Sequence, residues 1–534
     1  MSKFQLMRVM ILSVIALLAL FDPALSWIEN CLSYVVADVS NIKDHIFVIR
    51  CYIIFSCLLI GLFELQPAIW IYRGKFLIIT IFLLLFFLGY FVFNRTIHLD
   101  EFEHLHTSWK ISQGQTPYVD FFQHHHPLLW YLNLPLILIF EDSISTIYAM
   151  KCLALLMNLS LAFVTFLISK ELTNSRKAGI IAVIILLSFA MYTEKSIENR
   201  PDIPQVIFCL LCYYMFLLYQ KKKCVTYLIF SGLFWSIGFL FLQKALLFLL
   251  PIGLVMIWLT IIKEFNVKSL LIFGVAAITP FFLYLTWHIW EGTLSDYTLF
   301  NWVINLDRKN RSVPKHINIH ILSVFHFLCI AVSAFYFILN RNRFHSGKWS
   351  LFILSFLTLA AISSTPKPIS LHYFLPCLPL FASLIAICDH DMTWASKMWI
   401  RPYLLFILLS PVPNMIILSK IYSQDRQLEE LSFALKNSNK EETVWDKKLV
   451  GNVFRKDLHF FWYSFRNMKN YHQISDHPVY SNLVVNQVDP YDSCSLVVTK
   501  KPALIFTRNK EMSPCILERY TTLNHEFGIL APNR

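Results

Sequence analysis

Charged residues are scarce in this chain. Asp, Glu, Lys and Arg make up 15% of its 534 residues, whereas a soluble globular domain carries about 25%. Hydrophobic residues make up 56%, and the mean hydropathy is +0.55. Because water cannot surround so much apolar surface, this composition excludes a water-soluble globular protein. It predicts a polytopic α-helical membrane protein.

Glycine is also rare, at 13 residues. Transporters commonly carry charges within their spans and have Gly- or Pro-broken helices in paired halves. Here the ionisable residues lie mainly between the apolar runs, and there are neither solenoid-type repeats nor a low-complexity linker. These features argue against a transporter or flippase of lipid-linked precursors, which is kept as the first alternative function.

Cysteine pairs are nearly absent from the polar part of the chain. Most of the 12 cysteines lie in apolar runs, where Cys acts as a small hydrophobic residue. The C-terminal polar segment contains one pair, Cys494 and Cys515. An extracytoplasmic location of that segment would allow these two residues to form a disulfide.

Basic residues outnumber acidic ones, 46 to 34, which gives a net charge of +12. Such an excess can suit nucleic acid. Here, however, Lys and Arg occur in short clusters between apolar runs, which is the topology signal of a membrane protein. The charge pattern therefore predicts membrane lipid, and no nucleic acid, as a partner.

About thirteen apolar runs have the length of a membrane span. They cover residues 7–21, 46–72, 76–93, 144–169, 178–192, 203–219, 225–242, 244–262, 269–287, 319–339, 349–362, 372–388 and 402–419. The first run has Lys3 and Arg8 at its start and precedes Ala24-Leu25-Ser26, so a cleaved signal peptide is the alternative to an uncleaved span.

The basic clusters all fall on one side if the N-terminus is cytoplasmic and the spans alternate. These clusters lie at 73–75, 170–177, 221–223, 263–268, 341–348 and 397–401. The positive-inside rule then predicts a multi-pass inner (plasma) membrane protein. Its polar loops and its C-terminal segment would lie on the periplasmic, or extracytoplasmic, face.

The composition changes from about residue 421 onward, where charge, Asn and Pro increase. SQDRQLEELSFALKNSN is typical of an amphipathic helix, and KLVGNVF, SLVVT and PALIFT are typical of short strands. Such a segment suffices for a small α/β domain. The predicted division is therefore extra N-terminal helices over 1–75, a transmembrane domain over 76–420 with an outer loop at 94–143, and a C-terminal α/β domain over 421–534.

The loop at 98–127 is polar and histidine-rich, yet it lies between apolar runs. Ionisable groups beside a membrane are expected to have a function, because their desolvation is costly. In one interpretation Asp100 is a general base beside Glu101. In a second, Glu101, Glu103, His104 and the His124–His126 run bind a divalent metal ion, although successive side chains of HHH would diverge on a helix. The third is a solvated loop. The run EFEHLHTSWKIS predicts an interfacial helix with Trp109 at headgroup level.

Further ionisable groups occur at the predicted outer ends of other spans. They are Glu198, Arg200 and Asp202; Lys244; a basic loop containing Arg308; and Lys367 with His372 and Tyr373. An acid and several cations on one face, above an apolar groove, suit the displacement of a phosphate leaving group.

Five motifs follow one another in the chain. They are the acidic pair Asp100–Glu101; W-x-I-x-x-G-x-x-P-Y-x-D-F at 109–121 with His126-Pro127; R-P-D-I-P at 200–204; Gln243-Lys244 with an apolar run to Pro251; and H-Y-F-L-P at 372–376. Over residues 76–420 this order resembles the GT-C type membrane glycosyltransferases that use polyprenyl-phosphate sugars. These include dolichyl-phosphate-mannose protein mannosyltransferases and lipid A aminoarabinose transferases.

The resemblance implies a GT-C-like core and an inverting hexosyl- or pentosyltransferase of the cell envelope. Such an enzyme moves a sugar from a polyprenyl-phosphate donor to a hydroxyl or phosphate of a lipid, glycan or protein acceptor. It implies that Asp100, as the base, and Glu101 are the catalytic residues, that residues 76–420 form the catalytic domain, and that Lys244 contacts the donor phosphate. The other predicted donor- and substrate-binding residues are Arg200, Asp202, His126, Tyr118, Asp120, His372 and Arg308. A non-catalytic envelope glycan assembly protein is the second alternative function.

The metal alternative also stays open, with Glu101, His104 and His124 as its candidate ligands. One departure from the family concerns the N-terminus, where two predicted spans, 7–21 and 46–72, precede the family's usual first span.

Overall fold

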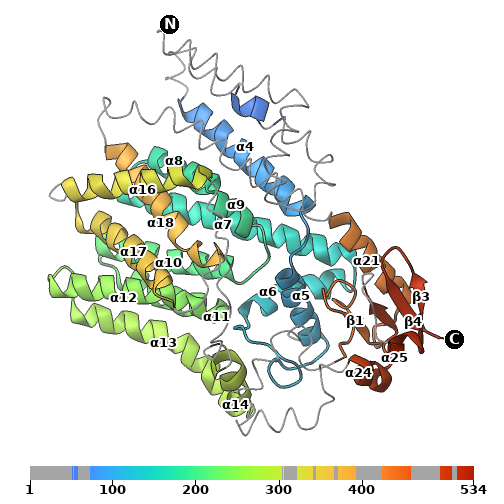
Figure 1. Cartoon of the computed structure of the whole chain (residues 1–534). Coiled ribbons are helices and arrows are strands. Elements are labelled where there is room, and N and C mark those ends of the chain that lie inside the picture. Colours follow the sequence, from blue (N-terminus) through green and yellow to red (C-terminus); the bar gives the residue numbers. More distant parts are fainter. Residues whose placement is uncertain are drawn as a thin grey trace.

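Apolar runs fold as helices in a membrane because each backbone N–H and C=O group must find its partner within the segment. The computed structural model describes residues 51, 53–57, 73–303, 305, 321–340, 344–365, 371–391, 424–458, 493–507 and 514–533. Within these ranges, helices form a bundle, and a small sheet lies at one end of it (Figure 1).

Among the described residues, six helices are long and apolar enough to cross a membrane. They are α4 (Arg73–Asn94), α7 (Ile144–Thr173), α10 (Asp202–Lys222), α12 (Leu246–Ile261, entered through the 3-10 turn η2, Gln243–Ala245), α13 (Val267–Trp290) and α17 (Ser346–Ser363). The other helices of the bundle are α6 (Leu128–Phe140), α8 (Arg176–Ser188), α9 (Ala190–Lys195), α11 (Val225–Phe241), α16 (Ile321–Leu339) and α18 (Cys377–Asp391).

Except for α6, which lies within the predicted outer loop at 94–143, these helices overlap the spans that the sequence predicts. The predicted span at 178–192 is broken, because α8 ends at Ser188 and α9 begins at Ala190 after an extended Phe189. The predicted spans 7–21 and 402–419 lie outside the described residues, as does most of 46–72. The chain is a membrane protein with several spans.

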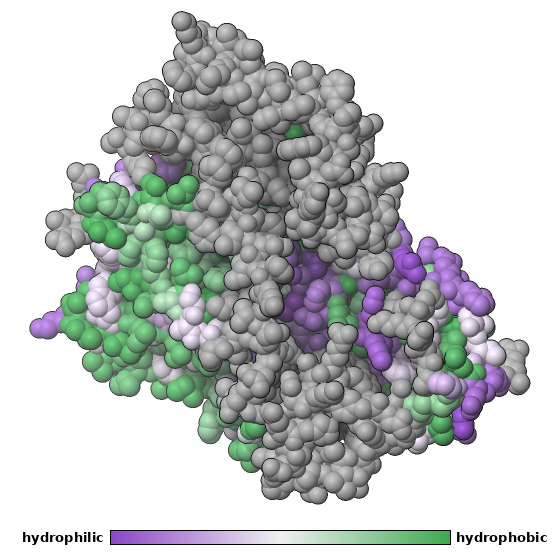
Figure 2. Space-filling model, in the orientation of Figure 1, coloured by the Kyte–Doolittle hydropathy of each residue, from purple (hydrophilic) through white to green (hydrophobic). Residues whose placement is uncertain are grey.

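Close helix packing and apolar outer faces characterise the bundle. A Cβ atom at Gly232 of α11 would lie 2.6 Å from the carbonyl oxygen of Phe273 on α13, so the small residue lets these two helices touch. Large apolar side chains on α12 and α13, such as Leu250, Leu271 and Phe282, are more than half exposed. Figure 2 shows hydrophobic residues gathered over the bundle, and more hydrophilic residues over the C-terminal part.

The loop between α4 and α6 contains helix α5 (Leu99–Ser112), as the sequence predicts. The predicted placement of Trp109 among lipid headgroups is wrong, because protein surrounds this side chain. Side chains from Glu101 to Lys110 are all buried, and the Trp109 indole N–H donates to Asp142 Oδ1 at 3.0 Å. Burial is tolerated because neighbouring elements satisfy the polar groups of α5.

The C-terminal segment forms a four-stranded sheet in the order β1-β2-β4-β3. Its elements are α21 (Gln424–Asn437), β1 (Val444–Asp446), α24 (Ser493–Lys500), β2 (Leu504–Phe506), α25 (Pro514–Leu517), β3 (Tyr520–Asn524) and β4 (Ile529–Pro532). β1 and β2 pair in parallel, and the other pairs are antiparallel. A disulfide joins Cys494 to Cys515, so α24 is tied to α25.

The helix at 424–437 and the strand in PALIFT are confirmed, whereas two other predicted strands are wrong. KLVGNVF (448–454) forms turns, because the Asp446 carboxylate accepts the N–H groups of Lys448, Val450 and Gly451. Its apolar residues pack against α5 instead of pairing in the sheet. SLVVT (495–499) lies within α24.

Buried polar contacts join the C-terminal segment to α5 and to the residues before it. His106 Nε2 lies 2.7 Å from Asp457 Oδ2, and Lys110 forms an ion pair with the same carboxylate. The Gln427 side chain bonds both the N–H and the C=O of Ile97. Burial alone would raise the pKa of Asp457, but His106 and Lys110 hold that pKa below its usual value. Asp457 is therefore a charged link between the C-terminal segment and α5.

Asp457→Asn should weaken the contacts of this side chain with His106 and Lys110. The variant leaves Lys110 buried without the Asp457 charge, which should lower the free energy of unfolding by about 3–5 kcal/mol. We expect a lower midpoint of thermal unfolding in detergent and faster proteolysis between the bundle and the sheet. Glu441→Gln is the control, because its ion pair with Lys456 is exposed. An Asp457→Asn protein as stable as this control would contradict the assignment.

Candidate active site

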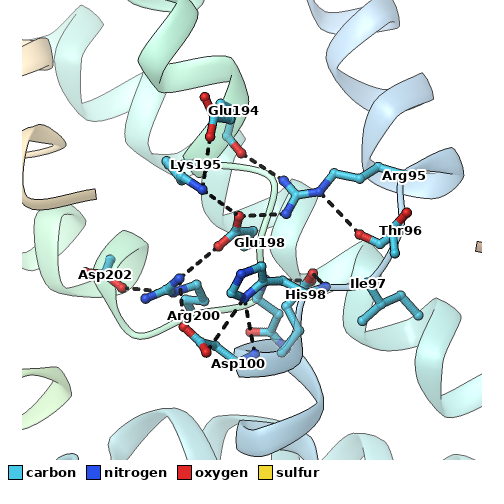
Figure 3. A network of polar contacts seen from close by, with 12 residues as sticks. Arg95, Thr96, Ile97, His98, Asp100, Glu194, Lys195, Glu198, Arg200 and Asp202 are labelled. Atoms are coloured by element: carbon cyan, nitrogen blue, oxygen red, sulfur yellow. Dashed lines mark hydrogen bonds and ion pairs between the residues drawn. The ribbon is translucent and has the colours of Figure 1, made fainter. Parts of the chain in front are cut away.

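The candidate site begins with one ion pair between distant parts of the chain. Asp100, in the first turn of α5, lies 2.8 Å from the Arg200 guanidinium. Arg200 also lies 3.1 Å from Glu198 and 3.3 Å from Asp202, so one cation is surrounded by three carboxylates (Figure 3). Asp100 keeps 32% of its side chain exposed, which leaves a path for a reacting group.

The charge network continues from Asp202 into the bundle. Lys244 Nζ, in η2, lies 3.7 Å from Asp202 and 2.8 Å from His372 Nε2 in the 3-10 turn η5 (Leu371–Phe374). The same ammonium group lies 4.3 Å from the centre of the Tyr373 ring. Residues from four separate parts of the sequence therefore meet at this site. All of them are among the candidate residues predicted from the sequence.

Glu198 connects the site to a second group of charges. Its carboxylate lies 2.6 Å from Arg95 and 3.5 Å from Lys195, and Arg95 also donates to the Glu194 carbonyl oxygen at 2.8 Å (Figure 3). Glu198 and Arg95 are buried. Alternating charges hold the loop before α10 against the end of α4, so Arg200 has a defined position.

The charges of the site decide its protonation. Burial tends to raise the pKa of Asp100, but the Arg200 guanidinium holds it below its usual value. Although burial would lower the pKa of Arg200, the three carboxylates around that guanidinium raise it. Asp100 is therefore an ionised carboxylate at neutral pH, beside a permanent cation.

His104, one turn after Asp100, is a neutral group. Burial is the main cause that lowers the pKa of His104, to about 4. The Trp130 indole N–H donates to His104 Nδ1 at 3.2 Å, so Nε2 carries the proton of the neutral ring. His104 therefore supplies an N–H donor, and no charge, at neutral pH.

Glu101 lies apart from Asp100 although the two are adjacent in sequence. Its carboxylate forms a fully buried ion pair with Lys151 of α7 at 2.8 Å. It also accepts the backbone N–H groups of Asn199 at 3.0 Å and His98 at 2.9 Å. Glu101 therefore positions α5 against the loop that carries Arg200. Lys151 is not among the site residues predicted from the sequence, although a lone Lys inside an apolar run is a signal of such a role.

Other candidate residues lie outside this charge network. His126 contacts the Phe239 carbonyl oxygen through Nδ1 at 2.6 Å and the Tyr297 hydroxyl through Nε2 at 3.1 Å. The Tyr118 hydroxyl donates to the His125 carbonyl oxygen at 2.6 Å. Asp120 is exposed and accepts the Thr116 N–H at 2.6 Å. Arg308 lies outside the described residues. These contacts shape the loop around the site.

The three candidate metal ligands do not come together as a set. Glu101 contacts Lys151, and His104 contacts Trp130. His124 lies with Glu103 and His125 instead, and one ligand atom from each of these residues lies within 4.8 Å of the others. A second group of ionisable side chains is thus present on the face of α5 that carries Asp100.

Comparisons with known proteins agree with this architecture. Residues 124–290 match the family model of dolichyl-phosphate-mannose-protein mannosyltransferases. Among solved structures, apo ArnT from Cupriavidus metallidurans has a TM-score of 0.58 at 11% identity, covering 86% of this chain and 98% of ArnT. ArnT bound to undecaprenyl phosphate has a TM-score of 0.53 at 10% identity, covering 73% and 85%. No curated protein sequence matches the chain.

The Archaeoglobus fulgidus oligosaccharyltransferase is a more distant likeness, with a TM-score of 0.45 at 13% identity. The match covers 70% of this chain, which spans 63% of the length of that protein. The two ArnT structures and the family model confirm the resemblance inferred from the motifs: the chain has the fold of the GT-C membrane glycosyltransferases.

Lys151→Met tests the positioning role of the buried ion pair. The change leaves the Glu101 carboxylate buried without the Lys151 cation, which should lower the free energy of unfolding by about 3–5 kcal/mol. We expect a lower midpoint of thermal unfolding in detergent. The double variant Glu101→Gln/Lys151→Met should recover part of this loss, because neither charge remains. If the single and double variants unfold together, the two residues are not coupled.

Proposed function

We propose that this chain is an inverting glycosyltransferase that takes a sugar from a polyprenyl-phosphate donor. The observation that carries this proposal is the continuous network from Asp100 through Arg200 and Asp202 to Lys244. It joins a partly exposed, ionised carboxylate to cations at the end of an apolar bundle. That combination provides a base for an acceptor hydroxyl and a positive charge for a phosphate leaving group.

The reaction would proceed as a single displacement. The acceptor oxygen attacks the anomeric carbon, and the bond from that carbon to the phosphate oxygen breaks. Asp100 takes the hydroxyl proton, and the electron pair leaves on the polyprenyl phosphate, whose negative charge Lys244 stabilises. A carboxylate with a lowered pKa is a weak base, but it suffices because the hydroxyl becomes strongly acidic as its oxygen bonds to carbon.

The donor class is supported by the ArnT structure that holds undecaprenyl phosphate, which has this fold. The family model matched at 124–290 supports a phosphate-linked lipid sugar in the same way. We propose a lipid, glycan or protein acceptor. Positive-inside charge clusters favour the extracytoplasmic face of the inner membrane for the site, with the N-terminus in the cytoplasm.

Asp100→Asn tests the role of the base. The amide keeps the size of the side chain but cannot accept the proton, so turnover should fall by about 10²–10⁴-fold with donor binding retained. The measurement is mass spectrometry of lipid extracts and surface glycans from cells that lack the chain, complemented with wild type or with the variant. A polyprenyl-phosphate sugar should accumulate, and one glycan should lose the corresponding mass.

Glu171→Gln is the matched control, because that carboxylate pairs with Lys221 at the opposite end of α7. It should restore the wild-type lipid profile. If Asp100→Asn also restores it, Asp100 is not the base, and a non-catalytic assembly protein becomes the better interpretation. A precursor that is retained on the cytoplasmic leaflet would instead point to a flippase.

Arg200→Gln should move the acid limb of the pH–rate profile. In the wild type, the guanidinium lowers the pKa of Asp100, so the base stays ionised until the pH falls below the ordinary aspartate range. Without Arg200, burial raises the pKa of Asp100, and protonation begins at higher pH. We expect turnover at saturating donor to fall at a higher pH in the variant. An unchanged acid limb would show that Arg200 does not act on the base.

A further inference from the structure

A second cluster of ionisable side chains lies beside the charge network. It consists of Glu103 on α5 and the adjacent residues His124 and His125, whose ligand atoms lie within 4.8 Å of one another. Glu103 and His124 are buried, and His125 is half-buried. We propose that these three residues form a binding site for a divalent transition-metal ion, with Zn²⁺ as the best match.

The local backbone allows two consecutive histidines to point the same way. Residues 122–127 are not helical, so the divergence expected for successive side chains on a helix does not apply. The rings of His124 and His125 have centroids 3.9 Å apart and a tilt of 38°. His126 faces Phe239 and Tyr297 instead. The run therefore separates into two candidate ligands and one structural histidine.

The carboxylate of the cluster is held by a neighbouring amide. Gln123 Nε2 donates to Glu103 Oε1 at 3.1 Å and to Thr107 Oγ1 at 2.9 Å. The amide oxygen of the same side chain accepts the N–H of His124 at 2.8 Å. Gln123 thus connects the carboxylate to the histidine backbone. Such outer contacts orient the ligands of protein metal sites.

The histidine backbone is fixed from the opposite side. Gln243 and Asn305 donate to the His124 carbonyl oxygen at 3.3 and 2.6 Å. The Tyr118 hydroxyl and the Asn301 amide donate to the His125 carbonyl oxygen at 2.6 and 2.8 Å. Four side chains therefore hold two peptide units, so both imidazoles are presented to Glu103 with little conformational freedom to lose on binding.

The ligand chemistry selects the ion. Two imidazoles and one carboxylate are typical ligands of Zn²⁺ in sites that keep a fourth position open. Mg²⁺ and Ca²⁺ prefer sites built from oxygen ligands. Bonds of about 2.0–2.1 Å in a tetrahedron place ligand atoms roughly 3.4 Å apart, so atoms that now lie within 4.8 Å of one another need to close by at most about 1.4 Å.

Metal content gives the direct test. Tag-free, full-length protein in detergent is stripped with a chelator, incubated with Zn²⁺, passed over a gel-filtration column and analysed by elemental mass spectrometry. We expect about one equivalent of Zn²⁺ in the wild type and a loss of that equivalent in Glu103→Gln and His124→Asn. His525→Asn is the control, because His525 is an exposed histidine of the C-terminal domain.

A fourth variant separates a built site from adsorption. Gln123→Ala keeps all three ligands but removes the amide that orients them, so it should weaken Zn²⁺ binding about 10- to 100-fold in a competition titration with a chromophoric chelator. If the wild type binds no Zn²⁺, or if Glu103→Gln and His124→Asn retain as much as His525→Asn, the proposal is wrong. Should Glu103→Gln not fold, His125→Gln replaces it, judged by the same criterion.

Discussion

Charges buried at the end of a membrane helix bundle must be balanced nearby, because neither lipid nor water is available to stabilise them. In this protein the balance is an alternation of acids and cations. Arg95 pairs with Glu198, Arg200 lies among three carboxylates, and Asp202 lies between Arg200 and Lys244. Each charged group is stabilised by the opposite charge beside it, and this pairing fixes its position. The proposed reaction centre depends on this alternation, since it leaves Asp100 ionised and partly open.

The position of α5 depends on contacts from both of its sides. Glu101 joins the start of the helix to α7 and to the loop before α10. His106 and Lys110 join its later turns to Asp457 in the C-terminal domain. The C-terminal segment, which we propose to be an extracytoplasmic domain, therefore helps to orient the helix that carries Asp100.

Much of the fold and part of the site could be predicted from the sequence. Apolar runs have a length that lipid dictates, so the positions of α4, α7, α10 and α13 followed from hydropathy alone. Asp100, Arg200, Lys244 and His372 were named from motifs, and they come together. The strands at 448–454 and 495–499 were mispredicted, because short apolar runs fit either state and tertiary packing decides between them.

The sequence by itself determined the class of the protein, the polar loop after α4 and the residue types at the site, because composition and periodicity respond directly to the solvent around a segment. The tertiary structure decided which side chains meet. Asp100 and Glu101 are neighbours in the chain, yet one contacts Arg200 and the other is buried with Lys151, because successive residues of a helix point about 100° apart. Which neighbour each of them reaches depends on helices that lie far away in sequence.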